Sequence, residues 1–386
     1  MRSVPRKNSI WILFYALSIL PCVAAENSSE TQPLQTDLTI ASEFIRPSSD
    51  GTHFVTAESG RNFVAWGFNY DHDSSGRLLE DYWYDEWNTV VEDFQEMKAL
   101  GANVVRIHLQ LAKFMRSQQE PDSSALQQLK KLVALAEELN LYLDITGLGC
   151  YHKQDVPAWY DALGEAERWQ VQTRFWEHIA RTCAESPAIF CYDLMNEPVI
   201  PGTSPETDWL LGELGGKYFV QRLTLDPAGR SQKEIAKTWV DLLTSAIRRH
   251  DQRHMITVGV IPWAHVFPKA QPLFYSEEVS ANLDFVSVHF YPKNGEVEKA
   301  LTALKVYHIG KPLVIEEMFP LHCSVEELET FIDSSRSIAD GYIGFYWGKT
   351  IEAYEQDSTD IAAAITRDWL TFFQTKGKEI FNDKSE

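Results

Sequence analysis

Two glutamate-containing motifs stand at the ends of apolar, strand-like runs. Asn196-Glu197-Pro198 follows one run, and Glu316-Glu317 ends another, with Glu317 lying 120 positions after Glu197. A carboxylate is costly to bury without a partner, so two such strand tips far apart in the sequence suggest a shared pocket. Two carboxyl groups that face one bond can act as acid and nucleophile, which is the chemistry of glycosidic bond hydrolysis.

The two motifs assign different roles to their carboxylates. Glu197 is the candidate general acid/base, although Pro198 could simply fix a turn there. Glu317 is the candidate nucleophile, and Glu316 is its rival. Adjacent strand residues point to opposite faces, so only one of this pair should face the interior of the fold. The other should point outward among helices and needs a basic partner.

Four further side chains could serve these carboxylates or a substrate. Arg106 could hold the nucleophile ionised through a forked pair of hydrogen bonds, or form a structural ion pair with an acid such as Asp144. His289 and Tyr291 share one face of their run and could orient a carboxylate or contact sugar hydroxyls. Trp347 could stack under a sugar ring or fill the core. Individually weaker candidates near strand ends are Asn69, His72, His108, His152, Trp159 and Trp263.

Strand-like and helix-like patterns alternate along the chain and must position these residues. The strand-like runs are 63–69, 103–109, 141–147, 188–195, 255–260, 284–290, 312–317 and 342–347. The helical patterns are 86–100, 123–139, 164–184, 231–250, 296–307, 324–338 and 360–375. Strands that alternate with helices in this way predict an α/β protein with a single (β/α)8 TIM barrel, whose site lies at the carboxyl ends of the strands.

The expected domain boundaries follow from composition and turn signals. We expect the barrel to occupy residues 43–386 and to begin with a short hairpin over 43–64. The segment 199–230 is a long loop after the fourth strand and should cover the site. Residues 26–42 are polar and expected to be flexible. Ser324, followed by acidic residues, should cap the helix that begins there.

Residues 1–25 have the pattern of a secretory signal peptide. Arg2, Arg6 and Lys7 precede the apolar run Ile10 to Leu20, whose 11 residues are too few to span a bilayer. We therefore expect a secreted or periplasmic protein without an integral membrane segment after cleavage. Lipid anchoring at Cys22 is disfavoured because Pro21 fits such a motif poorly.

Composition restricts the classes of partner. The net charge of −20 becomes −23 when the three basic residues of 1–25 are removed, which argues against nucleic acid. The 12 tryptophans suit stacking on sugar rings. No metal-binding motif or phosphate loop is found, so we expect no metal or cofactor, and we expect a monomer. The sequence does not give the pairing of the remaining cysteines, which are Cys150, Cys183, Cys191 and Cys323.

Together, these motifs resemble glycoside hydrolase family 5, the superfamily of retaining barrel glycosidases that includes cellulases and mannanases. The resemblance covers roughly residues 43–375. It implies that Glu197 is the acid/base, that Asn196 hydrogen-bonds the sugar 2-hydroxyl, and that Glu317 is the nucleophile. It also implies binding roles for the second-strand arginine, the sixth-strand His-x-Tyr pair and the eighth-strand tryptophan, which are Arg106, His289, Tyr291 and Trp347.

The resemblance implies a hydrolase of β-linked glucan or mannan that acts by double displacement. Met318 and Phe319 follow Glu317, where the family often has an aromatic residue and glycine, and this difference leaves the substrate open. Two alternatives remain. One is a carbohydrate-binding barrel without catalytic activity, and the other is a transglycosylase that uses the same covalent intermediate.

Overall fold

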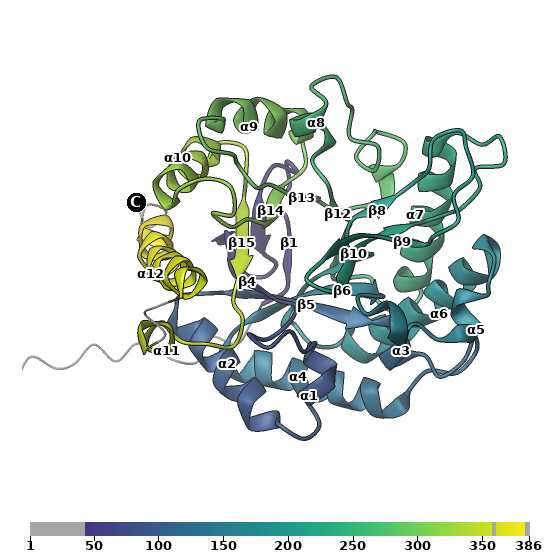
Figure 1. The fold of residues 1–386 in the computed structure, drawn as a ribbon, viewed down its shortest axis with the longest axis horizontal. Coiled ribbons are helices and arrows are strands. Elements are labelled where there is room, and N and C mark those ends of the chain that lie inside the picture. Colours follow the sequence, from purple (N-terminus) through teal and green to yellow (C-terminus); the bar gives the residue numbers. More distant parts are fainter. Residues whose placement is uncertain (1–42, 357–359, 383–386) are drawn as a thin grey trace, which may run out of the picture. The chain divides into compact units, whose positions relative to one another are not determined.

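Parallel strands form a closed barrel in the computed structural model, which describes residues 43–356 and 360–382 (Figure 1). The predicted signal peptide (1–25) and flexible segment (26–42) lie outside the described residues. The barrel strands are β4 (Ala65–Tyr70), β5 (Val104–Gln110), β6 (Tyr142–Gly149), β7 (Ile189–Asp193), β11 (Met255–Thr257), β12 (Gly259–Val260), β13 (Val286–His289), β14 (Leu313–Glu317) and β15 (Gly341–Phe345).

The fifth barrel strand is interrupted at Val258 and consists of two segments, β11 and β12. Segment β11 pairs with β7, whereas β12 pairs with β13, so the two segments together close the barrel. Side chains take over the backbone hydrogen bonds at the break. The carboxylate of Asp193 accepts the N–H of Gly259 at 2.8 Å, and the hydroxyl of Tyr275 bonds the backbone of Val258. Buried backbone groups therefore keep partners despite the interruption.

Helices surround the barrel, and each of the predicted helices is present. They are α2 (Trp87–Ala99), α4 (Ser123–Leu139), α6 (Glu165–Cys183), α7 (Gln232–Arg248), α9 (Val297–Leu304), α10 (Val325–Ser335) and α12 (Ile361–Asn382). The four-residue helix α8 (Trp263–Val266), which the sequence did not predict, follows the fifth strand. Further short helices are α1 (Leu79–Tyr82), α3 (Leu111–Phe114), α5 (Ala158–Asp161) and α11 (Ile351–Gln356).

Helix termini follow the capping pattern read from the sequence. The hydroxyl of Ser324 accepts the N–H of Glu327 at the start of α10, which confirms the predicted cap. The carboxylate of Asp122 accepts the N–H groups of Ser124 and Ala125 at 2.8 and 3.0 Å, respectively, and thereby starts α4. Caps and apolar spacing together explain why the predicted helix starts lie within one residue of the observed starts.

A small antiparallel sheet covers the amino-terminal end of the barrel. It contains β1 (Ile45–Pro47), β2 (Phe54–Thr56) and β3 (Asn62–Phe63), so the predicted hairpin is present and gains a third strand. Phe54 contacts the rings of Phe190 and Phe285 edge-on, with centroids 5.2 Å away in both cases. This packing buries apolar surface at the end of the barrel opposite the predicted site.

The predicted long loop after the fourth strand is partly a second small sheet. Strand β8 (Pro198–Val199) pairs with β10 (Lys217–Arg222), and β10 pairs with β9 (Leu210–Leu214). We call the β9–β10 pair the flap. The backbone N–H of Tyr218 donates to the carbonyl of Tyr151 at 2.9 Å, and the amide of Gln221 donates to the carbonyl of Leu148 at 2.8 Å. These bonds fix the flap to the carboxyl end of β6.

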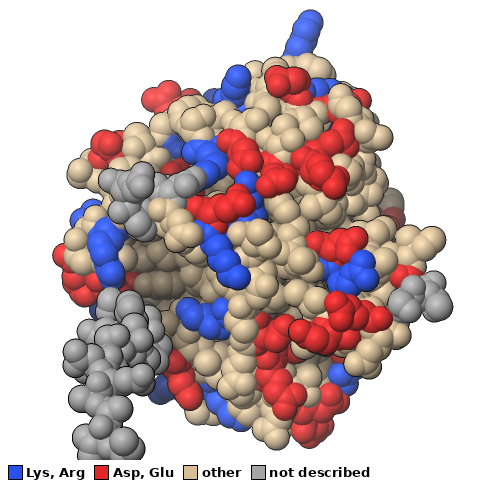
Figure 2. All heavy atoms as spheres, turned by 90° about the vertical axis from the view of Figure 1, so that its left-hand side faces the viewer, with Lys and Arg blue, Asp and Glu red and all other residues tan. Residues whose placement is uncertain are grey.

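The described residues contain no helix that is both long and apolar enough to cross a bilayer. Figure 2 shows acidic and basic side chains interspersed on one face of the molecule, without a continuous basic area on that face. Such a surface offers no extended contact for phosphate groups there.

Candidate active site

Glu197 and Glu317 meet at the carboxyl ends of the barrel strands. Glu197 follows β7, and Glu317 is the last residue of β14. Together with His289 they offer side-chain atoms that all lie within 4.8 Å of one another. The side chains of Glu197 and Glu317 are 16% and 13% exposed, so both remain accessible from outside. This is the shared pocket that the two strand tips suggested.

The turn after β7 aims Glu197 at this pocket. The backbone N–H of Glu197 donates to the carbonyl of Gly259 at 2.9 Å, which ties the turn to the interrupted fifth strand. The φ angle of Glu197 is 46°, in the left-handed region that non-glycine residues rarely adopt. Strain of this kind persists only where the surroundings enforce it, and it concentrates at functional sites.

Glu316 lies inside the barrel, so the expectation that it would point outward among the helices is wrong. The register between β13 and β14 shifts at Val288/His289, so that Val288 pairs with Ile315 but His289 pairs with Glu317. Glu316 is therefore the extra residue of a β-bulge, and strict alternation fails there. Its side chain is fully buried, whereas that of Glu317 is partly exposed, and this difference favours Glu317 for contact with a substrate.

Arg106 is completely buried at the centre of the site and donates hydrogen bonds to four of its side chains. Its Nη1 donates to Glu317 Oε1 at 2.9 Å and to Asn69 Oδ1 at 2.9 Å. Its Nη2 donates to Asp193 Oδ2 at 2.8 Å and to Asn196 Oδ1 at 2.9 Å. The guanidinium therefore contacts the candidate nucleophile directly, and its shortest ion pair, at 2.8 Å, is with Asp193 rather than with Asp144.

His289 and Tyr291 both face the carboxylates, as strand alternation predicted. His289 Nδ1 lies 2.8 Å from Glu197 Oε1 and 3.5 Å from Glu317 Oε2. The Tyr291 hydroxyl donates to Glu317 Oε2 at 2.6 Å. Glu317 thus receives one hydrogen bond from Arg106 and one from Tyr291, which fixes the orientation of its carboxylate.

Burial and neighbouring charges shift the protonation of these groups. Burial alone would favour neutral His289, but the charge of Glu317 and the hydrogen bonds to Glu197 and Glu316 raise its pKa to about 10. For Glu317, burial and the proximity of Glu197 raise the pKa, against the opposing influence of His289, Arg106 and Tyr291. These neighbours therefore favour the imidazolium form of His289 at neutral pH.

Asn196 connects the site to the flap. Its Oδ1 accepts from Arg106, and its Nδ2 donates to the carbonyl of Phe219 at 2.9 Å. A contact with a sugar hydroxyl would use the second hydrogen of Nδ2. The position of the flap and the orientation of this amide consequently depend on each other.

Trp347 lies two residues beyond the end of β15, rather than within the last strand as predicted. Its ring stacks on Phe345 with centroids 5.4 Å apart and meets Phe319 edge-on at 5.2 Å. The indole N–H has no hydrogen-bond partner among the described residues. Trp347 is thus half-buried in an aromatic group, with an unused donor.

Sequence reasoning missed one buried acid below these residues, Asp193. Asp193 holds Arg106, accepts the hydroxyl of Thr146 at 2.8 Å and accepts the N–H of Gly259. A charged residue inside an otherwise apolar strand was the available signal. A Cβ atom on Gly259 would lie 2.4 Å from Glu316 Oε2 and 2.7 Å from His289 Nε2. The absence of a side chain at position 259 therefore makes room for this pair.

Two groups of side chains in the described residues have the spacing of metal ligands: Asp144, Cys191 and Glu316, and Glu197, His289 and Glu317. Arg106 lies 3.4 Å from Glu316 and 2.9 Å from Glu317. Its guanidinium already supplies positive charge to both groups and would repel a cation. The arrangement therefore suits proton transfer and nucleophilic attack better than metal binding.

A separate cavity of about 650 Å³ lies between the start of α6 and the segments that flank the flap, 207–210 and 224–226. Its lining includes Trp209, Asp161 and Arg230, and it contains none of the predicted site residues. Arg168 covers one face of Trp209, with the guanidinium carbon 4.0 Å from the ring centroid. The cavity is thus distinct from the carboxylate pair.

Comparisons with known proteins agree with this architecture. An exo-β-1,4-mannosidase from Opitutaceae bacterium strain TAV5 is 16% identical with a TM-score of 0.62; the match covers 87% of this chain and 62% of that one. The β-1,4-mannanase of the sea hare Aplysia kurodai is 15% identical with a TM-score of 0.55, covering 85% and 95% of the two chains. The β-mannanase of the blue mussel Mytilus edulis is 16% identical with the same TM-score, covering 86% and 96%.

At these identities the structural likeness shows the fold, a (β/α)8 barrel. The chain spans about three fifths of the Opitutaceae enzyme's length. No curated protein sequence matches the chain. Residues 57–349 match the family model described as Cellulase (glycosyl hydrolase family 5). The chain therefore belongs to glycosyl hydrolase family 5.

Proposed function

We propose that this protein is a secreted, retaining hydrolase of β-linked mannan or glucan. The observation that carries the proposal is the closeness of Glu197 and Glu317, which offer atoms within 4.8 Å of each other around His289. Retaining enzymes have carboxyl groups about 5–5.5 Å apart, whereas inverting enzymes need roughly 6.5–9.5 Å to admit a water molecule. The short separation supports double displacement.

In the first step, Glu317 attacks the anomeric carbon while Glu197 protonates the leaving oxygen. Arg106 and Tyr291 hold the two oxygens of Glu317, so the attacking carboxylate needs little reorganisation. In the second step, Glu197 takes a proton from water, which attacks the glycosyl–Glu317 ester and releases the sugar with its original configuration. The imidazolium of His289 stays hydrogen-bonded to Glu197 in both steps.

Mannans and manno-oligosaccharides come first among candidate substrates, because the three similar structures above are described as mannosidases or mannanases. β-1,4-Glucans come second, because an endoglucanase from Thermobifida fusca has a similar fold, with a TM-score of 0.51. An exposed aromatic pair beyond the fifth strand, Trp263 and Phe267, stacks with centroids 6.2 Å apart and could contact a longer chain.

Azide rescue tests the two roles separately. With an aryl β-glycoside, azide should restore turnover to Glu197→Ala by replacing water in the second step, giving the β-glycosyl azide. With Glu317→Ala, azide should replace the missing carboxylate in a single displacement, giving the α-glycosyl azide. A 2-deoxy-2-fluoro glycoside should label Glu317 in the wild type. Labelling of Glu316, or inverted products from the wild type, would contradict the assignment.

The alternatives predict different outcomes when β-mannans, β-glucans and their aryl oligoglycosides are tested as substrates. A carbohydrate-binding barrel without catalytic activity would bind one polysaccharide tightly and turn over none. A transglycosylase would show retained stereochemistry but transfer most glycosyl groups to sugar at high acceptor concentration.

The proposed export through residues 1–25 is tested by sequencing the amino terminus of the protein recovered outside the cytoplasm, which should begin near Glu26.

A further inference from the structure

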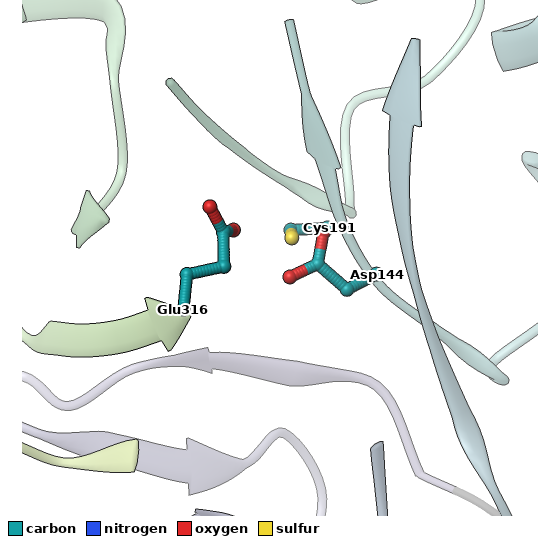
Figure 3. Close-up of side chains that lie close together, drawn as sticks. All are labelled: Asp144, Cys191 and Glu316. Atoms are coloured by element: carbon teal, nitrogen blue, oxygen red, sulfur yellow. The ribbon is translucent and has the colours of Figure 1, made fainter. Parts of the chain in front are cut away.

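Three fully buried side chains meet inside the barrel, one layer deeper than the pocket. They are Asp144 of β6, Cys191 of β7 and Glu316 of β14. Figure 3 shows the carboxyl groups of Asp144 and Glu316 extending toward each other, with the sulfur of Cys191 beside them. One atom from each residue lies within 4.8 Å of the others. The double displacement described above does not use this cluster.

The hydrogen bonding of the two carboxyl groups is incomplete. Three of their four oxygens accept no hydrogen bond from any described residue. They are both oxygens of Asp144 and Oε1 of Glu316. The remaining oxygen, Glu316 Oε2, lies 3.3 Å from His289 Nε2 and 3.4 Å from Arg106 Nη2. Two ionised carboxylates in a fully buried place would repel each other, whereas one shared proton satisfies both. The proton belongs on Asp144, because the cationic neighbours contact Glu316.

We propose that Asp144 is a protonated acid that donates a hydrogen bond to Glu316, and that the single negative charge of this pair acts together with Glu317 and Glu197 to keep His289 protonated and oriented toward Glu197. Asp144 and Glu316 are then positioning residues that act through His289. The effect on catalysis rests on the proposed function, but the location of the proton does not.

The charges around His289 support this arrangement. His289 faces Glu197 beyond β7, Glu316 and Glu317 of β14, and Arg106 and His108 of β5. Burial raises the pKa of Asp144 well above its usual value, with the charge of Glu316 adding to the effect. For Glu316, burial is outweighed by Arg106 and His289, which lower its pKa to about 2. Burial and Arg106 keep the pKa of His108 far below normal, so that ring stays neutral.

A protonated His289 has a specific consequence for Glu197. Both ring nitrogens then donate, with Nε2–H directed to Glu316 and Nδ1–H to Oε1 of Glu197. The proton that Glu197 delivers to the leaving oxygen must consequently sit on its other oxygen, Oε2. The buried pair thereby determines which face of the Glu197 carboxyl group performs the acid/base chemistry.

Infrared difference spectroscopy of the purified full-length protein locates the proton. The spectrum of the wild type minus that of Asp144→Asn should show the carbonyl stretch of one protonated carboxylic acid. The spectra are recorded at pH 8, where exposed acids are ionised. Cys191→Ala is the matched control in the same cluster and should retain the band. Absence of the band in the wild type would overturn the proposal, as would a stoichiometric metal ion that copurifies with the wild type and is lost in Asp144→Asn.

Histidine-selective NMR tests the second half of the proposal without any activity measurement. The His289 signal is assigned by its loss in His289→Ala. In the wild type it should remain that of an imidazolium at pH 8, and in Glu316→Gln its titration should move down by more than one pH unit. A neutral His289 at pH 8 in the wild type, or an unchanged titration in Glu316→Gln, would overturn the positioning role. Hydrolysis tested alongside reports separately on the proposed function.

Discussion

At the scale of single residues, the backbone conformation of Glu197 leads to a prediction about stability that does not depend on activity. Its φ of 46° costs a residue with a Cβ atom roughly 1 kcal/mol, whereas glycine adopts it freely. Glu197→Gly should therefore have a free energy of unfolding about 1 kcal/mol higher than Glu197→Ala, measured by urea denaturation. The reverse order, which is usual at ordinary positions, would show that the turn relaxes when the carboxylate is removed.

The pKa of Glu317 governs a second prediction at this scale. In the proposed mechanism only ionised Glu317 reacts, and burial together with Glu197 raises its pKa above the usual 4.5. Activity should therefore be lost as the pH falls through a value above 4.5, seen as the acid limb of the kcat/KM profile.

Tyr291→Phe removes a hydrogen bond that lowers this pKa. The acid limb should move to still higher pH, and kcat/KM at its optimum should fall roughly ten- to hundredfold, as for the loss of a hydrogen bond to a charged group. An acid limb that stays in place would mean that Tyr291 does not stabilise the ionised form.

At the scale of elements, the flap depends on its turn. Gly215 and Gly216 connect β9 to β10 with φ angles of 59° and 80°, as a tight hairpin turn requires. Replacing both by alanine should strain the turn by about 1–2 kcal/mol and speed amide exchange in β9 and β10. The contact between Asn196 and Phe219 should loosen, so KM should rise while the melting temperature barely changes.

The matched control for the flap is Gly202→Ala. Gly202 lies in the same segment, has no positive φ, and has open space where a Cβ would be built. The Gly202→Ala substitution should leave amide exchange in the flap unchanged. Equal effects of the control and the double substitution would show that the turn is not what holds the flap.

The elements also show where sequence reasoning succeeded and failed. Helix α4 was predicted at its observed bounds because capping and apolar spacing are local properties of the chain. The bulge that turns Glu316 inward and the break at Val258 depend on hydrogen bonds between distant strands, which no local pattern contains. The two carboxylates of the pocket were found because they lie at or just beyond strand ends. Asp193, the last residue of β7, was overlooked because the sequence placed it inside a longer apolar run, 188–195.

At the scale of the whole molecule, the state of the cysteines, free thiol or disulfide, can be predicted and measured. Cys150, Cys183, Cys191 and Cys323 are all free in the structure, and only Cys323 is not fully buried. Burial raises the pKa of Cys150 to about 12 and that of Cys323 to about 11, which keeps the reactive thiolate scarce.

A thiol-reactive dye should accordingly label at most Cys323 in the native protein. In denaturant without reductant, it should label all four of these cysteines, and a fifth if Cys22 is retained. The same titration after reduction is the control. Fewer thiols before reduction than after it would show that the protein forms a disulfide that this structure lacks.

The missing side chain at Gly259 has a consequence for how this protein can diverge. A methyl group there would collide with the carboxylate of Glu316 and with His289, so the two positions cannot drift independently. Among homologues of this chain, we expect glycine at position 259 wherever position 316 is an acid. We expect alanine or serine at position 259 only where the side chain at position 316 is small. Directed evolution would meet the same constraint: libraries that vary position 316 should include position 259.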